Sequence, residues 1–564
     1  MNSFRKYNLI TGWFTFLVAL IVYLLTIEPS VSLWDCGEFI ASSYKMQVGH
    51  PPGAPLFMLL GRFFALFTSD PARVAMMFNS LSALSSALTI LFLFWTISHL
   101  LKKVFLKEES DHNFTNYLLV LGSALVGALT YTFSDTFWFS AVEAEVYATS
   151  SLFTAVVFWA ILKWENIADE PHANRWLILI AYLIGLSIGV HLLNLLAIPA
   201  IVLVYYFRKY EVTRQGIIKA ILAAVLILGS IMYIIIPGLV KIATWFELLF
   251  TNSLGFHFNT GIMVYMVLLL GLLSFGIFRT QFRNKNVLVN TILLGITVII
   301  IGYSSFALII IRSSVDPPMN ENRPDNPFAL LSYLNREQYG DRPLIAGNQY
   351  NATFESVEYK KPVWMLDTET GKYIDPIKKP EIKYKESKIL FPRMYSRDPS
   401  HRDVYESYGT IKDVSNPTYL DNIEFLIRYQ LGHMYFRYFM WNFVGRQNDI
   451  QGDDILNGNW ISGIKGIDKL RIGNQSALTD DMKNHPSRNT YYFLPLILGI
   501  IGLFFHQKHN NKDFWIIMFL FVLTGIAIVI YLNQPPLQPR ERDYAYAGSF
   551  YAFAIWVGMG VAGL

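Results

Sequence analysis

Long apolar runs constrain this chain more than any other feature of its sequence. Runs of about twenty residues, the length that a helix needs to cross about 30 Å of hydrocarbon, recur along the sequence. Only 16% of the residues are charged, against about 25% in typical soluble proteins. Lipid leaves only helices and closed barrels as spanning structures, and these runs are too long for barrel strands. The sequence therefore predicts an all-α polytopic membrane protein with about 11–13 spans.

The candidate spans are residues 9–27, 74–101, 117–134, 146–163, 175–190, 192–207, 216–236, 261–278, 287–311, 489–505, 514–532 and 549–564. A shorter run at 54–67 contains Arg62, which predicts an interfacial helix or half-span. The last apolar run, from Phe550 to Leu564, is short for a final span. We therefore expect the natural chain to continue beyond it.

Basic residues fall in alternate connections between these spans. Lys and Arg occupy the N-terminus and the loops that contain Lys102, Arg208 and Arg283, whereas the intervening short loops near 135–145, 191 and 252–260 carry none. The positive-inside rule assigns the basic set to the cytoplasm. The opposite, outer face then receives the first loop, the hydrophilic segment 312–488 and the loop 533–548.

These assignments predict three parts. Residues 1–311 form a transmembrane bundle with a first outer loop at 28–73, residues 312–488 form an outer segment of mixed helical, extended and irregular structure, and residues 489–564 add C-terminal spans that we expect to be truncated. Within the outer segment, 328–339 predicts a short helix. The aromatic block 435–443 predicts an interfacial or re-entrant helix. The alternative, an amphipathic helix that packs this segment on the bundle, is compatible with it.

Two carboxylates directly follow the first span. Asp35 and Glu38 lie in Trp34-Asp35-Cys36-Gly37-Glu38, and His50 follows in Gly49-His50-Pro51-Pro52-Gly53. On a helix, residues three apart share a face, so one acid could act as a base while the other orients a substrate. The alternative is a solvated loop with two ordinary acids. The gathering of polar residues on the outer face favours the site.

Further polar residues on the outer face are candidates for substrate binding. Glu143 and Glu145 stand at the mouth of the fourth span, where two residues two apart on a helix would point to different sides. They could instead complement the helix dipole. His191 follows Gly189-Val190 at an outer turn and is either a site residue or a structural histidine.

The loop 533–548 contains a dense cluster of charges, Arg540-Glu541-Arg542-Asp543. Arginines on the outer face run against the positive-inside bias, and their guanidinium groups bind phosphate bidentately. Arg540 and Arg542 therefore predict contact with a lipid-linked phosphate or pyrophosphate. The alternative is a set of ion pairs that fixes the loop.

The sequence lacks the motifs of several other catalytic chemistries. The sequence shows no Walker loop, dinucleotide fingerprint, zinc-ligand spacing or nucleophile elbow. Cys36 is the only cysteine, so no intramolecular disulfide forms, and no pattern supplies it with a base for a nucleophilic role. We predict no metal ligands, although Asp35 and Glu38 are two carboxylates that could bind a divalent ion.

Several of these motifs together resemble one family of bacterial multi-spanning proteins. They are Trp34-Asp35-Cys36-Gly37-Glu38, Gly49-His50-Pro51-Pro52-Gly53, Glu143-Ala144-Glu145-Val146-Tyr147, Gly189-Val190-His191, Arg336-Glu337-Gln338-Tyr339-Gly340, Arg437-Tyr438-Phe439-Met440-Trp441-Asn442-Phe443 and Arg540-Glu541-Arg542-Asp543-Tyr544. The family is the protein O-mannosyltransferase-like glycosyltransferase family 117, formerly of unknown function, which has an animal relative that O-mannosylates receptor ectodomains.

The resemblance implies a GT-C architecture and a polyprenyl-phosphate sugar as donor. Asp35 would be the general base that activates a Ser or Thr hydroxyl, Glu38 would orient the acceptor or the base, and Arg540 and Arg542 would neutralise the leaving phosphate. It also implies inversion at the sugar, exported proteins as acceptors, and a site that faces the periplasm from the bacterial inner membrane. No cofactor besides the lipid-linked donor and no nucleic-acid partner are expected, and the oligomeric state stays open.

Two other functions compete with this interpretation. A GT-C enzyme could modify a lipid or an envelope glycan instead of a protein. A transporter of a lipid-linked substrate would place ionisable residues near mid-span and would show pseudo-symmetric halves. The charges here lie mainly at the outer ends of spans, which favours the transferase.

Overall fold

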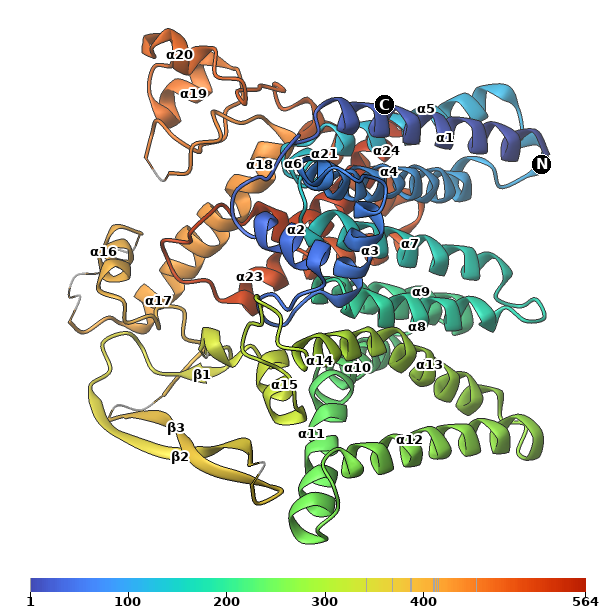
Figure 1. Cartoon of the computed structure of the whole chain (residues 1–564). Helices are drawn as coiled ribbons and strands as arrows, with labels where there is room; N and C mark the ends of the chain where they lie inside the picture. Colours follow the sequence, from blue (N-terminus) through green and yellow to red (C-terminus); the bar gives the residue numbers. More distant parts are fainter. Residues whose placement is uncertain are drawn as a thin grey trace.

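The computed structural model describes residues 2–564 apart from 341, 368, 386–387, 409–410, 412, 414 and 453. Within these residues, ten helical segments are long and apolar enough to cross a membrane. They form one bundle, and the hydrophilic segment 312–488 lies at the end opposite the N-terminus (Figure 1). The predicted polytopic helical fold with a smaller, strand-containing part is confirmed, and it is consistent with a GT-C-like bundle.

The bundle is built from helices of nearly continuous apolar sequence. They are α1 (Asn2–Leu25), α4 (Val74–Phe105), α5 (Phe114–Thr132), α7 (Val146–Ile167), α8 (Asn174–Ile188), α9 (Ile198–Lys209), α10 (Arg214–Gly229), α11 (Ile236–Leu248), α12 (Thr260–Phe278), α13 (Val287–Tyr303), α14 (Ala307–Ser313), α21 (Leu494–His509), α22 (Asn511–Leu523), α23 (Ile526–Leu532) and α24 (Ala547–Gly563). Shorter helices α2 (Cys36–Lys45), α3 (Pro55–Ala65) and α6 (Asp135–Ala141) lie in the loops between them.

The last helix, α24, forms the centre of the packed bundle. Its side chains are almost all buried, and it packs against α5 and α21. Glycines permit the close approach, because a Cβ on Gly560 would lie 2.0 Å from the carbonyl oxygen of Leu498, and one on Gly127 would lie 2.9 Å from that of Ala554. Small residues at helix crossings are the usual means of close packing in membranes.

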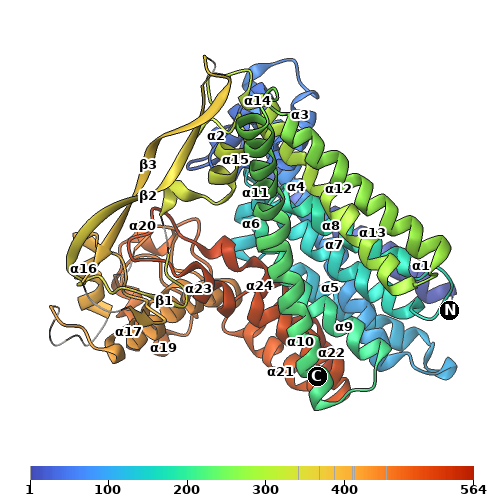
Figure 2. The same ribbon diagram turned by 90° about the horizontal axis from the view of Figure 1, so that it is seen from below.

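The hydrophilic segment combines short helices with two small antiparallel sheets. Its elements are α15 (Pro327–Leu334), β1 (Ala346–Gly347), β2 (Phe354–Asp367), β3 (Lys372–Tyr384), β4 (Ile389–Leu390), α16 (Pro399–Tyr408), α17 (Tyr419–Phe425), α18 (Arg437–Phe443), α19 (Lys465–Ile472) and α20 (Asp480–Lys483). Strands β2 and β3 form a long hairpin with Asp367 opposite Lys372, and β1 pairs with β4. Figure 2 shows the hairpin reaching along the side of the molecule beyond the bundle.

The span predictions hold with two corrections. The predicted spans 175–190 and 489–505 become α8, with 15 residues, and α21, with 16 residues, which are shorter than the ten long segments. The final run is longer than predicted, because a 3₁₀ turn from Asp543 to Tyr546 leads directly into α24 and the combined segment has 21 residues. The predicted interfacial run 54–67 forms α3.

Two predictions for the hydrophilic segment are refined. The helix predicted at 328–339 ends at Leu334, because Arg336 adopts a positive φ of 55° and breaks it. The aromatic block 435–443 covers the end of a π-helical stretch, Leu426–Phe436, and the whole of α18. Its rings are largely buried, and α18 packs against α6 and α21, so this segment packs on the bundle, which is compatible with an interfacial position.

The close packing of α24 predicts a large difference between two glycine substitutions. Gly560→Ala should lower the free energy of unfolding by about 1–3 kcal/mol, because the new methyl group meets backbone that cannot yield easily. Gly271→Ala on α12 is the matched control, since a Cβ there meets no atom within 4 Å. Thermal unfolding of both variants in detergent measures the difference. Equal melting temperatures would contradict the packing described for α24.

Candidate active site

Asp35 lies at the entrance to α2, immediately after the loop that leaves the first span. It occupies the N-cap position of this helix, yet its side chain caps no backbone group. The carboxylate is half exposed, with 47% of the side chain accessible, and its Oδ2 lies 4.0 Å from Nη2 of Arg540. Asp35 is therefore a carboxylate open to solvent on one side and close to a guanidinium on the other.

Glu38 lies one turn further along α2 and binds His50. Its Oε1 accepts hydrogen bonds from the backbone N–H of His50 at 2.6 Å and from Nδ1 of its ring at 2.8 Å. Burial of Glu38 opposes its ionisation, but these bonds and the charge of His50 outweigh it and lower the pKa of Glu38. Gly49 makes the contact possible, because a Cβ there would lie 2.3 Å from the same oxygen. Glu38 thus fixes the loop that carries His50.

The same contact acts on the histidine. Burial lowers the pKa of His50, but the hydrogen bond and charge of Glu38 outweigh this effect and raise it. The raised pKa of His50 and the lowered pKa of Glu38 both favour the charged form of this pair. The roles predicted for Glu38 in orienting the acceptor and for His50 in substrate binding stay predictions.

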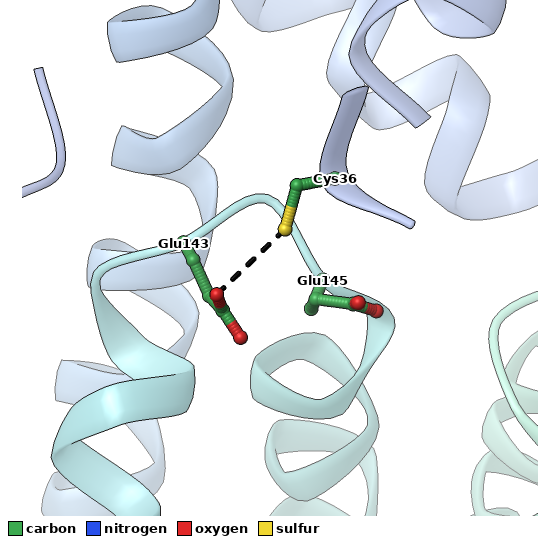
Figure 3. Close-up of side chains that lie close together, drawn as sticks. All are labelled: Cys36, Glu143 and Glu145. Carbon is green, nitrogen blue, oxygen red and sulfur yellow. Dashed lines mark hydrogen bonds between the residues drawn. The ribbon is translucent and has the colours of Figure 1, made fainter. Parts of the chain in front are cut away.

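Glu143 and Glu145 lie in the connection between α6 and α7, facing the start of α2 (Figure 3). Both side chains are buried, and one ligand-type atom from each lies within 4.8 Å of the others and of Sγ of Cys36. The expectation that these two acids point to different sides of a helix is wrong. The connection is not helical, and Glu145 has extended backbone at the N-cap of α7, so a helical spacing does not apply.

Burial sets the ionisation of these two acids. Glu143 accepts hydrogen bonds from Oγ of Ser32 at 3.1 Å and Sγ of Cys36 at 3.7 Å, yet burial and the nearby charge of Glu145 raise its pKa to about 8. Burial also raises the pKa of Glu145, to about 7, and the Arg540 guanidinium opposes this rise. Burial raises the pKa of the Cys36 thiol as well, which disfavours a thiolate nucleophile.

A thiol and two carboxylates are donor types that bind divalent cations. Here the cluster already has a cation beside it, because Nη2 of Arg540 donates to Oε1 of Glu145 at 2.9 Å. Arg540 is itself buried. It therefore supplies locally the positive charge that a metal would otherwise bring.

The two arginines of the last loop share the ring of Tyr544. The guanidinium carbon of Arg540 lies 4.5 Å from its centroid and that of Arg542 lies 6.0 Å from it. Arg542 also donates to the hydroxyl of Tyr544 and, through Nε, to Gln538 at 3.2 Å. Within the described residues no carboxylate lies in ion-pair distance of Arg542, whereas Arg540 is paired with Glu145. The alternative of a loop fixed by ion pairs therefore holds for Arg540.

His191 lies at the edge of this group. Its ring lies 5.4 Å from that of Tyr147, which stacks on Tyr544 at 4.1 Å. Nδ1 of His191 accepts from the backbone N–H of Leu193 at 3.2 Å, and burial lowers the pKa of the ring to about 4. These contacts favour a neutral histidine that caps the following turn. A substrate-binding role for it stays a prediction.

Sequence reasoning missed one ion pair that holds the last loop. Glu541 accepts from both terminal nitrogens of Arg437 on α18, at 3.0 and 2.6 Å, and from the hydroxyl of Tyr438 at 2.6 Å. A bidentate pair of this kind restrains the backbone between the two arginines. Both partners lie in motifs that were visible in the sequence, but nothing in the sequence joins them.

A small cavity lies behind Tyr147 and Tyr544, with Ser150 and Asn194 among its lining residues. Its volume is about 30 Å³, which suits a single water molecule and not a sugar. Because this cavity cannot hold a sugar, the solvent-exposed side of the Asp35 carboxylate is the accessible part of the site.

Comparisons with known proteins agree with this assembly of motifs. Residues 35–214 match the model of the "Protein O-mannosyl-transferase TMEM260 N-terminal domain", and residues 340–427 match a family of unknown function, DUF8416. The chain is 26% identical over 200 residues to protein O-mannosyl-transferase tmem260 of Dictyostelium discoideum and 25% identical over 228 residues to TMEM260 of Mus musculus. No solved structure matches the chain.

These matches confirm the predicted resemblance to an O-mannosyltransferase-like family over residues 35–214. The alignments cover 34% and 40% of this chain, but only 22% and 30% of the two relatives. The matched region contains Asp35, Glu38, His50, the two buried glutamates and His191, and it ends before the arginines of the last loop.

The buried glutamate predicts a pH dependence of stability. The pKa of Glu143 rises from an ordinary 4.5 to about 8 in the folded protein. Between these values the folded state binds more protons than the unfolded state, so the stability present below pH 4.5 is lost as the pH rises towards about 8. Glu143→Gln does not titrate, so its melting temperature should fall less over this range than that of the wild type.

Thermal unfolding at a series of pH values measures this slope. Glu170→Gln, in an exposed turn, is the matched control and should keep the wild-type slope. An unchanged slope in Glu143→Gln would show that Glu143 is ionised in the folded protein across the whole range.

Proposed function

We propose that this chain is a membrane glycosyltransferase that transfers mannose from a polyprenyl-phosphate donor to Ser or Thr hydroxyls of exported proteins. The reaction takes place at the periplasmic face of the bacterial inner membrane. The observation that carries the proposal is the position of Asp35, a half-exposed carboxylate 4.0 Å from the buried guanidinium of Arg540. The match of residues 35–214 to the O-mannosyl-transferase family model supports it.

Asp35 acts as the general base. An acceptor hydroxyl is a weak nucleophile, and a carboxylate that takes its proton as the new bond forms contributes about 10²–10⁴ to the rate. The oxygen of Ser or Thr forms a bond to the anomeric carbon while the bond from that carbon to the phosphate oxygen breaks. The bonding electrons leave with the phosphate, the proton passes to Asp35, and the single displacement inverts the anomeric centre.

The two arginines have different roles in the proposed reaction. Arg540 is held by Glu145, and its guanidinium lies beside the carboxylate of Asp35. Arg542 has no carboxylate within ion-pair distance among the described residues, and Tyr544 and Gln538 orient its guanidinium. It is therefore the better candidate to bind the leaving phosphate, where charge develops in the transition state.

Other residues position this machinery. Glu38 and His50 hold the loop that follows α2, and the Arg437–Glu541 pair restrains the backbone between the two arginines. Positioned groups of this kind cost little reorganisation during the reaction. Substrate contacts by His50, Glu143 and His191 are compatible with this arrangement but are not required by it.

Sugar transfer by purified protein tests the proposal. Asp35→Asn keeps the shape of the side chain and removes the base, so the rate of labelling of exported acceptor proteins from polyprenyl-phosphate mannose should fall about 100-fold or more. Asp70→Asn is the matched control. Asp70 lies in the same loop and is 53% exposed. It pairs with Arg73 and accepts a hydrogen bond from the backbone N–H of Ala72, which an Asn side chain can also accept, so this variant should keep the wild-type rate.

Two results would contradict the proposal. Equal rates for wild type and a folded Asp35→Asn variant would remove the base assignment. No labelling by the wild type, with this donor and a broad pool of exported proteins, would reject the reaction itself.

A further inference from the structure

A cationic pocket lies at the C-terminal end of α2, away from Asp35. It has a volume of about 330 Å³ and is lined by Tyr44, Lys45, Met46, Arg62 and Arg312. Lys45 ends α2, Arg62 comes from α3, and Arg312 comes from the end of α14. A pocket of this size accommodates a small polar group and is far larger than a single water site.

The three basic side chains of this pocket lack acidic partners. In the described part of the chain, no carboxylate lies within 4.0 Å of Lys45, Arg62 or Arg312, although seventeen other pairs are formed. The ring of Tyr44 is close to two of them, with its centroid 5.1 Å from Nζ of Lys45 and 5.3 Å from the guanidinium carbon of Arg62. Like charges gathered without a counter-ion favour the binding of an anion.

The backbone holds both guanidinium groups in place. Nη1 of Arg62 donates to the carbonyl of Tyr44 at 2.9 Å, and Nε of Arg312 donates to the carbonyl of Met46. These carbonyls belong to the end of α2, where helix carbonyls lack partners of their own. Each guanidinium has five N–H donors, so each keeps others free for a ligand. The backbone therefore orients both guanidinium groups and leaves N–H donors of each free to bind a ligand.

Exposed apolar side chains lie close in the sequence to two of these basic residues, Arg62 and Arg312. On α3 and directly after it, Phe63 is 55% exposed, Leu66 65% and Phe67 66%. Beside Arg312, Ile311 and Val315 are each 61% exposed. Exposed aromatic and aliphatic groups next to arginine at the end of a span are typical of the headgroup level of a bilayer. The anion that reaches this pocket is therefore the headgroup of a lipid.

The pocket is too far from Asp35 to hold the phosphate of a reacting donor. Asp35 and Lys45 stand at opposite ends of α2, so a rise of 1.5 Å per residue separates their backbones by about 15 Å. In a sugar phosphate the phosphate oxygen is bonded directly to the anomeric carbon that the acceptor attacks. A donor phosphate in this pocket would leave its reacting carbon out of reach of the base.

We propose that Lys45, Arg62 and Arg312 form a binding site for the phosphate headgroup of an anionic membrane phospholipid, separate from the transferase site. Basic pockets between spans bind anionic headgroups through charge and hydrogen bonds. The bound lipid joins α2, α3 and α14 at the membrane surface. The proposal goes beyond the transferase function and stands on the pocket alone.

Lipid binding to the full chain tests the proposal. Native mass spectrometry of the protein in detergent compares the retention of phosphatidylglycerol and of phosphatidylcholine with the same acyl chains. The wild type should retain phosphatidylglycerol preferentially. Arg62→Gln with Arg312→Gln should lower that preference roughly tenfold, because each basic group near an anionic headgroup adds to its binding.

Three controls separate the alternatives. Arg279→Gln with Arg283→Gln removes two exposed arginines after α12 and should leave the preference unchanged. Arg62→Lys with Arg312→Lys keeps the charge and should retain most of the binding. Glycerol phosphate at millimolar concentration should not displace the lipid, whereas equal competition would indicate a site for soluble phosphate and overturn the proposal.

Other outcomes would overturn it too. Undiminished phosphatidylglycerol retention in the Gln pair would show that the pocket does not bind the headgroup. A higher KM for the donor in the Gln pair, with unchanged phosphatidylglycerol retention, would show that the pocket serves the donor instead. If the Gln pair does not fold, Arg62→Gln alone should show a smaller loss in the same assay, and no loss would count against the site.

Discussion

The buried ion pair between Arg540 and Glu145 is the interaction on which the rest of the site depends. It joins the last loop of the chain to the connection before α7, and it places a guanidinium beside Asp35 in the first loop. Breaking a buried pair on one side leaves an uncompensated charge and is strongly destabilising. The pair therefore fixes the relative positions of three loops that are distant in the sequence, and it does so without using the accessible carboxylate of Asp35.

The surrounding contacts extend the same arrangement. Glu38 fastens the loop after α2 through His50, and Glu541 fastens the last loop to α18 through Arg437. The acids in this region differ in burial. Glu143 is buried, and its raised pKa favours the protonated form, whereas the carboxylate of Asp35 is accessible to solvent. The environment of Glu143, and not its residue type, therefore sets its ionisation.

The sequence predicted the parts of this structure that depend on local pattern. Apolar run length predicted the spans, and the positive-inside rule predicted one common face for the acids and arginines, among which Asp35, Glu145 and Arg540 lie close together. It failed where the backbone departs from regular geometry. Glu143 and Glu145 are both buried because their connection is not helical, and the last apolar segment is longer than predicted because a 3₁₀ turn precedes α24. Partners such as Arg437 and Glu541 are joined only by the fold, which no local pattern encodes.

An experimental structure with a bound polyprenyl-phosphate sugar tests the central claim most directly. The account predicts that the phosphate contacts Arg542, that the anomeric carbon faces the open side of Asp35, and that the Arg540–Glu145 pair stays intact. A donor whose phosphate lies in the pocket of Lys45, Arg62 and Arg312, or whose anomeric carbon lies beyond the reach of Asp35, would contradict both the base assignment and the separation of the two anion sites.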